Sequence, residues 1–217
     1  MAFRVGVLVS GRGTNLQALI NASKKGVLSA EIAVVISNNP KAPALERAQK
    51  QQIPTKGIDP RAYPNTPAFE EAIVQELQNR KVDLVILAGF MKILSSTIIR
   101  AFPQRIINIH PALLPSFPGL HVQRKAIEHG VRFSGCTVHF VDESVDGGPI
   151  IIQAVVPLEP EDTEETLAAR ILKKEHQILP RAVQWIAKGR VKIEGRKVTI
   201  AGIRKRDEGS LTNPPLD

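Results

Sequence analysis

The sequence predicts an α/β fold: a Rossmann-like, mostly parallel and twisted sheet with flanking helices, and antiparallel strands in the C-terminal half. Up to about residue 110, short apolar runs alternate with segments of helical periodicity, which is typical of parallel strands joined by right-handed crossovers. After residue 133, two extended runs follow each other with only a loop between them, as antiparallel neighbours do. A length of 217 residues with 43% hydrophobic content suits a globular chain with a sizeable core.

The first half supplies the parallel strands. Residues 3–9 form a near-continuous apolar run, which predicts a strand buried on both faces. A glycine-containing turn at 10–15 then leads into a helix with Leu16, Leu19 and Ile20 at helical spacing. The alternation continues through a strand at 32–36, a helix at 42–51, a strand at 55–58, a helix from Pro67, a strand at 83–88, a helix at 95–101 and a strand at 105–110.

The second half changes pattern. Residues 134–141 and 150–156 are extended runs joined by a polar loop, followed by a helix from about Thr163 to Lys188 with an acidic start. A short hairpin ends the pattern, with strands at 191–193 and 197–200. We expect one domain over residues 1–202, with halves at 1–103 and 104–202, and a basic, flexible tail at 203–217.

Composition excludes some classes of protein. No apolar stretch approaches the roughly 20 residues that cross a bilayer, and the chain enters a strand at once, so we expect no signal peptide and no membrane partner. Cys136, the single cysteine, cannot form an internal disulfide and has no activating partner in sequence, which favours a reducing cytoplasm and argues against a thiol nucleophile. No His and Cys cluster has metal-ligand spacing, so we expect no metal.

The net charge of +8 is unevenly distributed. From Lys188 onward, eight Lys or Arg oppose four Asp or Glu, so this segment supplies +4. A nucleic-acid-binding tail is one interpretation of Arg204-Lys205-Arg206; a solvated chain end is the favoured one, because the segment is weakly hydrophobic. A basic surface also suits anionic small molecules.

The glycine loop Gly11-Arg12-Gly13-Thr14-Asn15 lies between a buried strand and a helix. Backbone amides and the helix dipole bind anions in that setting. The third glycine of the dinucleotide fingerprint is replaced by Leu16, and no acid ends the second strand. The loop therefore predicts a monophosphate pocket, with a purely structural turn as the alternative.

Asn108 and His110 end an apolar strand, one residue apart, so their side chains share a face. Open sheets bind ligands at this end of their strands, and a carboxamide beside an imidazole can polarise a carbonyl and move a proton. Asp146, in Asp-Gly-Gly-Pro, is either a turn residue or a carboxylate that approaches His110, orients its ring and raises its pKa.

The remaining polar candidates are less clear. Glu175 interrupts an apolar helical stripe, and a buried carboxylate is unfavourable unless it is paired or bound to a ligand. Lys173 and Lys174 could reach a phosphate. Among the other histidines, His121 is a candidate for capping or orienting its loop, His139 is interpreted as structural or surface, and His129 as a solvated helix end.

Taken together, these segments resemble the phosphoribosylglycinamide formyltransferases, folate-dependent enzymes of purine synthesis. The matching segments are 10–16, 87–94, 107–121, 146–150 and 175–180, spread over nearly the whole chain. The Asn-x-His pair and the distant Asp are shared by the wider formyltransferase superfamily. The glycine loop together with Pro118-Gly119-Leu120-His121 points to this family.

The resemblance implies transfer of the formyl group of 10-formyltetrahydrofolate to the amino group of 5'-phosphoribosylglycinamide, by direct amine attack through a tetrahedral intermediate. It implies a phosphate-binding N-terminal half, a folate-binding and catalytic C-terminal half, small-molecule partners without nucleic acid, and a monomer or homodimer. The catalytic residues would be Asn108, His110 and Asp146. The implied substrate-binding residues are Gly13, Thr14, Asn15, Glu175, Lys173, Pro111 and Gly119. The implied folate-binding residues are Met91, Lys92, Ile93, Leu94, Asn108, Val141, Asp142 and Val145.

Two positions depart from the family pattern. Thr66-Pro67 lies where some members have a basic residue for the folate tail, and Leu172 lies where some have a phosphate-directed lysine, so Lys173 or Lys174 is expected to substitute. Four alternatives remain: a formyltetrahydrofolate hydrolase or a methionyl-tRNA formyltransferase, each expected to carry an additional domain, a nucleic-acid-binding module, and a nucleotide-binding regulatory protein without turnover.

Overall fold

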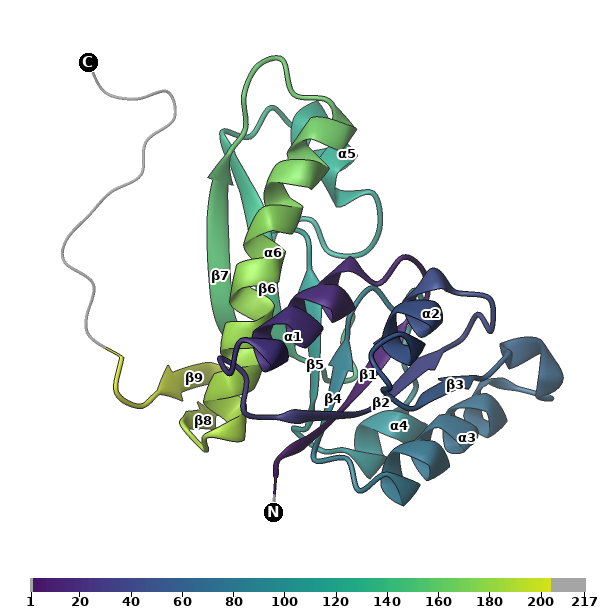
Figure 1. The fold of residues 1–217 in the computed structure, drawn as a ribbon. Coiled ribbons are helices and arrows are strands. Elements are labelled where there is room, and N and C mark those ends of the chain that lie inside the picture. Colours follow the sequence, from purple (N-terminus) through teal and green to yellow (C-terminus); the bar gives the residue numbers. More distant parts are fainter. Residues whose placement is uncertain (1, 204–217) are drawn as a thin grey trace.

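A twisted seven-stranded sheet forms the centre of the molecule (Figure 1) in the computed structural model, which describes residues 2–203. The strand order is β3-β2-β1-β4-β5-β6-β7. Pairing is parallel from β3 to β5 and antiparallel at β5–β6 and β6–β7. The strands of this sheet are β1 (Arg4–Val9), β2 (Glu31–Ser37), β3 (Thr55–Gly57), β4 (Leu84–Leu87), β5 (Ile106–His110), β6 (Phe133–Phe140) and β7 (Ile150–Pro157).

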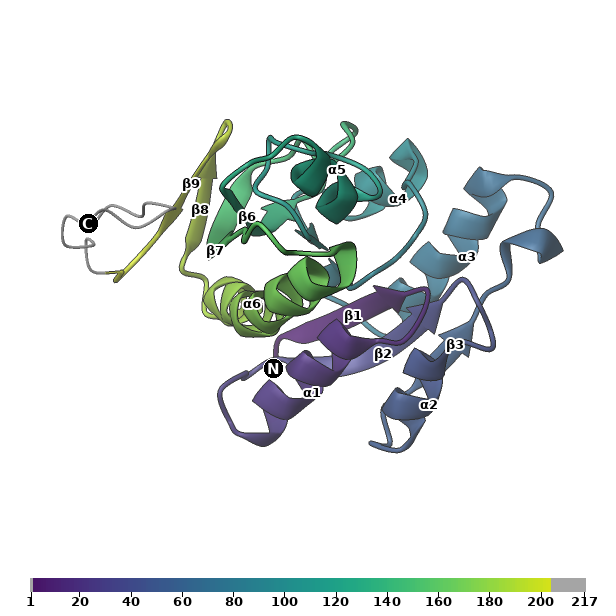
Figure 2. The ribbon, with the colours of Figure 1, turned by 90° about the horizontal axis from the view of Figure 1, so that it is seen from above.

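Helices cover both faces of the sheet (Figure 2), because the inner strands are apolar on both sides. The helices are α1 (Thr14–Lys24), α2 (Pro43–Gln49), α3 (Thr66–Asn79), α4 (Ser96–Ala101), α5 (Val122–Glu128) and α6 (Glu164–Ala187), with a 3-10 turn at Pro60–Ala62. One hydrophobic cluster joins the sheet to α1, α2, α5 and α6, and a second joins it to α3 and α4.

Strand β5 divides its residues between these two faces. Ile107 and Ile109 belong to the cluster under α1 and α6, whereas Ile106 belongs to the cluster under α3 and α4. Side chains alternate along a strand. Asn108 and His110 therefore project on the Ile106 side, at the carboxyl end of the parallel strands.

Helix α6 lies beside α1 (Figures 1 and 2), and polar bonds tie it to the α1 region at two levels. Asn15 Nδ2 donates to Glu175 Oε2 at 2.7 Å, and the backbone N–H of Ser29 donates to Gln184 Oε1 at 2.8 Å. A capping box between Thr163 and Thr166 begins α6. After α6, the strands β8 (Val191–Glu194) and β9 (Lys197–Ile200) form a separate antiparallel hairpin.

The predicted fold class is confirmed, and each predicted strand and helix is present with bounds shifted by a few residues at most. The bounds of α5 and the 3-10 turn at Pro60–Ala62 were not predicted. The basic tail lies outside the described residues except for Ile203. Over residues 2–203, none of the helices has the length and apolar character needed to cross a bilayer.

Replacing Gly148 with alanine is expected to lower the free energy of unfolding by about 1–3 kcal/mol. A Cβ atom at this position would lie 1.9 Å from the carbonyl oxygen of Phe140, a backbone atom that belongs to the sheet. Urea denaturation measures the effect. Gly11→Ala is the matched control, because a Cβ there meets nothing within 4 Å, and it should change stability by less than about 0.5 kcal/mol. Equal stability of the two variants would contradict the expected close contact.

Candidate active site

Asp146 meets the tip of β5. Its Oδ1 lies 3.4 Å from Asn108 Nδ2, and its Oδ2 lies 3.4 Å from His110 Nδ1. The loop after β6 carries Asp146 in a left-handed conformation, with φ of 53°, and the backbone N–H of Gly119 donates to Asp146 Oδ2 at 2.8 Å. The three side chains predicted to converge are therefore neighbours in space, although Asp146 is 36 residues beyond His110 in the numbering.

His139 is a fourth member of this cluster. From the sequence alone, this histidine is interpreted as structural or surface. It pairs directly with Asn108 across β5 and β6 and is 2% exposed. Its Nδ1 donates to the carbonyl oxygen of Phe140 at 2.8 Å, so in the neutral ring Nε2 accepts, and Asn108 Nδ2 lies 3.2 Å from it. His139 therefore orients the Asn108 amide so that its N–H groups face His139 and the Asp146 carboxylate.

Contrary to the prediction from sequence, the pKa of His110 does not rise beside Asp146 but falls. Burial is the largest influence and lowers the pKa of His110 below its ordinary value, despite the opposing effects of the Phe117 carbonyl and Asp146. Burial raises the pKa of Asp146, but the nearby His139 side chain and the Gly119 N–H lower it by more, so the net pKa lies below the ordinary value. Asp146 is therefore ionised over the neutral pH range.

Both ring nitrogens of His110 nevertheless face oxygen atoms. Nε2 lies 3.0 Å from the carbonyl oxygen of Phe117, and Nδ1 lies 3.4 Å from Asp146 Oδ2. Only the imidazolium can donate at both positions. The surroundings therefore supply partners for a protonated ring, while burial in the free protein favours the neutral one.

The glycine loop forms a cradle at the start of α1. Gly13 has φ of 70°, and a Cβ there would lie 2.6 Å from Ala44 Cβ, so packing against α2 as well as backbone conformation requires glycine. Gly13 provides no side-chain cap for α1. The first-turn N–H groups of α1 are therefore available to an anion in the absence of a capping side chain.

Glu175 reaches this cradle from α6. It is 7% exposed and accepts a hydrogen bond from Asn15, whose Oδ1 is buried without a partner among the described residues. Burial raises the pKa of Glu175, and the bond from Asn15 only partly opposes this. The apolar stripe of α6 is thus interrupted by a carboxylate that is paired with the glycine loop, a partner that the sequence did not identify.

An apolar wall lies beyond β4 and β6. Met91, Ile93 and Val145 are exposed by 65%, 76% and 53%. Leu94 and Val141 pack beside them on the hydrophobic cluster under α3 and α4. This wall is on the side of the sheet to which Asn108 and His110 project.

Ser10 connects the glycine loop to this wall. Its hydroxyl donates to Asn38 Oδ1 at 2.6 Å and accepts from the backbone N–H of Met91 at 2.7 Å. Of the other predicted wall residues, Lys92 is exposed, and Asp142 accepts bonds from the backbone and side chain of Ser144. The glycine loop and the apolar wall are therefore joined by direct hydrogen bonds.

The remaining candidate residues from the sequence analysis differ in exposure and in their contacts. Lys173 is exposed and lies about 200° around α6 from Glu175 at the usual 3.6 residues per turn, so its placement beside the phosphate stays a prediction. Pro111 and Gly119 are half-buried, and the Gly119 N–H is committed to Asp146. His121 begins α5 without making a side-chain cap, and His129 is exposed at the end of α5, as predicted.

The described part of the chain contains no group of three or more His, Cys, Asp or Glu side chains placed to hold a metal ion. Cys136 is buried, and burial raises the pKa of its thiol to about 12. A thiolate is therefore unavailable at neutral pH, which agrees with the sequence argument against a thiol nucleophile.

The pH dependence of stability should reveal the buried charge of Glu175. A carboxyl whose pKa is raised by folding binds more protons in the folded state, so stability falls as pH rises from its ordinary value of 4.5 through the raised value. Glu175→Gln keeps an acceptor for Asn15 and removes this titration. The melting temperature of the variant, minus that of the parent, should therefore increase over this range. The exposed Glu71→Gln is the control; a pH-independent difference for Glu175→Gln would contradict the assignment.

Comparisons with known proteins agree with one another. A family model described as formyl transferase matches residues 3–183. The trifunctional purine biosynthetic protein adenosine-3 of Drosophila melanogaster is 46% identical over 86% of this chain, which spans only 14% of that protein. The phosphoribosylglycinamide formyltransferase of Haemophilus influenzae is 43% identical over 92% of this chain and 94% of its own length. Glycinamide ribonucleotide transformylase 1 from Symbiobacterium toebii has a similar structure, with a TM-score of 0.90, 51% identity and coverage of 92% and 94%.

Proposed function

Because the chain belongs to the formyl transferase family, we propose that it transfers the formyl group of 10-formyltetrahydrofolate to the amino group of 5'-phosphoribosylglycinamide. The names of the Haemophilus influenzae and Symbiobacterium toebii relatives, each similar over most of its own length, support this substrate. The observation that carries the proposal is the convergence of Asn108, His110 and Asp146 at the carboxyl end of the parallel strands. The uncapped start of α1 and the exposed Met91 and Ile93 follow β1 and β4 at the same edge of the sheet.

The apolar wall fits a folate ring system. Exposed Met91, Ile93 and Val145 offer a surface for a flat heterocycle, and polar backbone groups at its edge can orient the ring. Bound there, the folate co-substrate supplies the formyl group. We propose that Lys92, Leu94, Val141 and Asp142 also contact the folate.

The cradle fits a ribonucleotide. The amides at the start of α1, with the Thr14 and Asn15 side chains, would hold the phosphate. Glu175 would accept bonds from the ribose hydroxyls, which gives this buried carboxylate a second partner besides Asn15. The unpartnered Asn15 Oδ1 supports a ligand with hydroxyl donors at this position.

Asn108 would stabilise the oxyanion that forms when the amine attacks. Its two amide hydrogens face His139 at 3.2 Å and Asp146 at 3.4 Å. We propose that the longer contact is exchanged for one to the formyl oxygen, while the bond to His139 keeps the amide in place.

Asp146 would accept the proton that the attacking amine loses, directly or through water. The bond between the formyl carbon and the folate nitrogen then breaks, and the folate nitrogen leaves with that proton. His110 would take up a proton as the substrates bind and react, because the phosphate and then the developing oxyanion add negative charge that opposes the effect of burial. The two oxygen atoms facing its ring support this charged form. We place the reaction in the cytoplasm of the cell, with a monomer or homodimer as the working form.

The deciding experiment follows folate product spectroscopically in the presence and absence of 5'-phosphoribosylglycinamide. Product should form only with the ribonucleotide present, in a one-to-one ratio with formylated ribonucleotide. Product that forms at the same rate without the ribonucleotide would identify a hydrolase instead. Binding of the ribonucleotide without any product from either mixture would identify a regulatory protein.

A further inference from the structure

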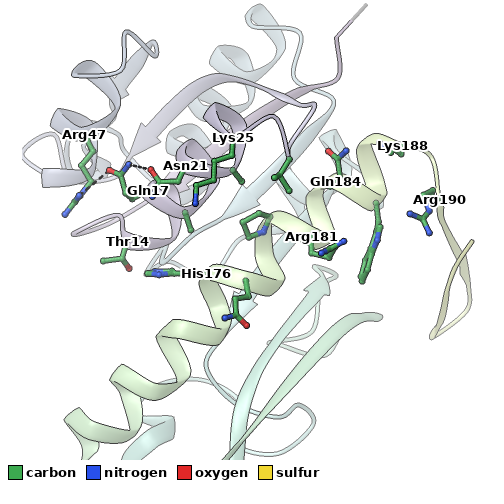
Figure 3. A pocket seen from close by; sticks show the side chains of 16 residues that line it. Thr14, Gln17, Asn21, Lys25, Arg47, His176, Arg181, Gln184, Lys188 and Arg190 are labelled. Carbon is green, nitrogen blue, oxygen red and sulfur yellow. Dashed lines mark hydrogen bonds between the residues drawn. The ribbon is translucent and has the colours of Figure 1, made fainter. Parts of the chain in front are cut away.

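A cavity lies away from the candidate catalytic residues, in the groove between α1 and the C-terminal half of α6 (Figure 3). Its volume is about 640 Å³, within the usual size range of ligand pockets. Asn108, His110 and Asp146 do not line it, and Thr14 is the one lining residue that also belongs to the proposed phosphate cradle. We call this cavity the α1–α6 groove.

The charge of the α1–α6 groove has one sign. Its lining contains Lys25, Arg47, Arg181, Lys188 and Arg190, and none of its sixteen lining residues is Asp or Glu. Within residues 2–203, Lys25, Arg181 and Lys188 have no carboxylate partner. A concave surface lined by uncompensated cations attracts anions strongly.

The neutral polar groups of the groove also select an anion. Gln17 Nε2 donates to Asn21 Oδ1 at 3.0 Å, and Gln184 Oε1 accepts from Ser29. These bonds occupy the amide oxygens and leave the N–H groups of Asn21 and Gln184 as donors for a ligand. Near Thr14, the Nε2 atom of His176 is buried and has no hydrogen-bond partner within the described chain.

Length and shape favour an extended ligand. Figure 3 shows Thr14 and Arg47 at one end of the groove and Lys188 and Arg190 at the other. From His176 to Lys188 the groove follows 12 residues of α6 and its end, or roughly 18 Å of helix. A single phosphate cannot reach both ends. Trp185 and Pro180 supply an apolar part of the lining where a planar ring can pack.

We propose that the α1–α6 groove binds a nucleoside polyphosphate, with its phosphates on the cations and its base against Trp185. Binding in this groove is independent of the proposed catalytic function. One consequence does rest on that function: a ligand that reaches Thr14 competes with the ribonucleotide substrate but not with the folate.

Tryptophan fluorescence tests the proposal directly, because Trp185 is the only tryptophan in the chain. The intact protein is titrated, without divalent cations, with ATP, inorganic triphosphate and adenosine. ATP should change the emission saturably, triphosphate should bind more weakly, and adenosine should give no saturable change at the same concentrations. The ATP affinity should also fall as salt concentration rises.

Two variants define the site. Arg181→Gln combined with Lys188→Gln removes two exposed cations from the groove and should weaken ATP binding on the order of tenfold. Lys24→Gln is the control, because Lys24 ends α1, the helix on the other side of the groove, but does not line the groove, and it should leave the affinity unchanged.

Several results would overturn the proposal. They are an emission that does not respond to ATP or triphosphate, and an equal loss of affinity in the double variant and in Lys24→Gln. Triphosphate binding as tightly as ATP would overturn the nucleoside assignment. A response to single-stranded RNA alone would overturn the small-ligand assignment. Because these measurements need no turnover, an inactive protein that binds ATP in this way would contradict the proposed function and leave the groove proposal standing.

Discussion

Replacing Asn108 with alanine should lower kcat by roughly 100- to 1000-fold, the usual effect of removing one oxyanion donor. The amide is held by His139 on one side and directed at Asp146 on the other. Water cannot replace it with the same orientation. KM for both substrates should change far less than kcat, because the proposed contact forms only as charge develops on the formyl oxygen.

Asn79→Ala is the control for this variant, since Asn79 is an exposed residue at the end of α3. Circular dichroism and a melting curve establish that both variants are folded. A kcat for Asn108→Ala within a few-fold of the parent value would contradict the oxyanion role, provided that the variant retains its melting transition.

Replacing Asp146 with asparagine should lower kcat by roughly 100- to 10,000-fold, the range expected when a positioned proton acceptor is lost. The variant keeps the size of the side chain and an oxygen that can accept from the Gly119 N–H. It loses the negative charge that raises the pKa of His110 and that, in the proposed mechanism, accepts the amine proton. The pH dependence of kcat should change as well, because His110 then titrates without this neighbour.

Glu143→Gln is the matched control for Asp146→Asn, because Glu143 is an exposed acid in the same loop after β6. It should retain the parent kcat and the parent pH profile. The relay assignment fails if the two variants have similar rates, or if Asp146→Asn is slow but its pH profile is identical to that of the parent protein.

Local sequence pattern is sufficient where neighbours in the chain decide the structure. The apolar run at Arg4–Val9 and the turn at Gly13 predict a buried strand and an uncapped helix start, because burial on both faces and a left-handed glycine are local requirements. The alternation of Ile107, Asn108, Ile109 and His110 likewise predicts that the two polar side chains share a face. Both features are present in the structure.

Contacts that depend on register or on distant packing could not be predicted. His139 reaches Asn108 because β5 and β6 pair in one specific register, which an alternating sequence does not reveal. Asn15 and Glu175 are 160 positions apart and meet only because α6 packs beside α1. The direction of the His110 pKa shift depends on the balance between burial and the Asp146 charge, and that balance is a property of the assembled site.

The two-sided character of β5 has a consequence for how this protein can diversify. The isoleucines Ile107 and Ile109 fill one core, whereas Asn108 and His110 project on the opposite face, so a single-residue insertion or deletion inside the strand would exchange their directions. A point substitution in β5 changes one side chain, whereas an insertion or deletion reverses the direction of every side chain between it and the end of the strand. Length variation among descendants of this chain should therefore be confined to its loops, and absent from the six residues that precede Pro111.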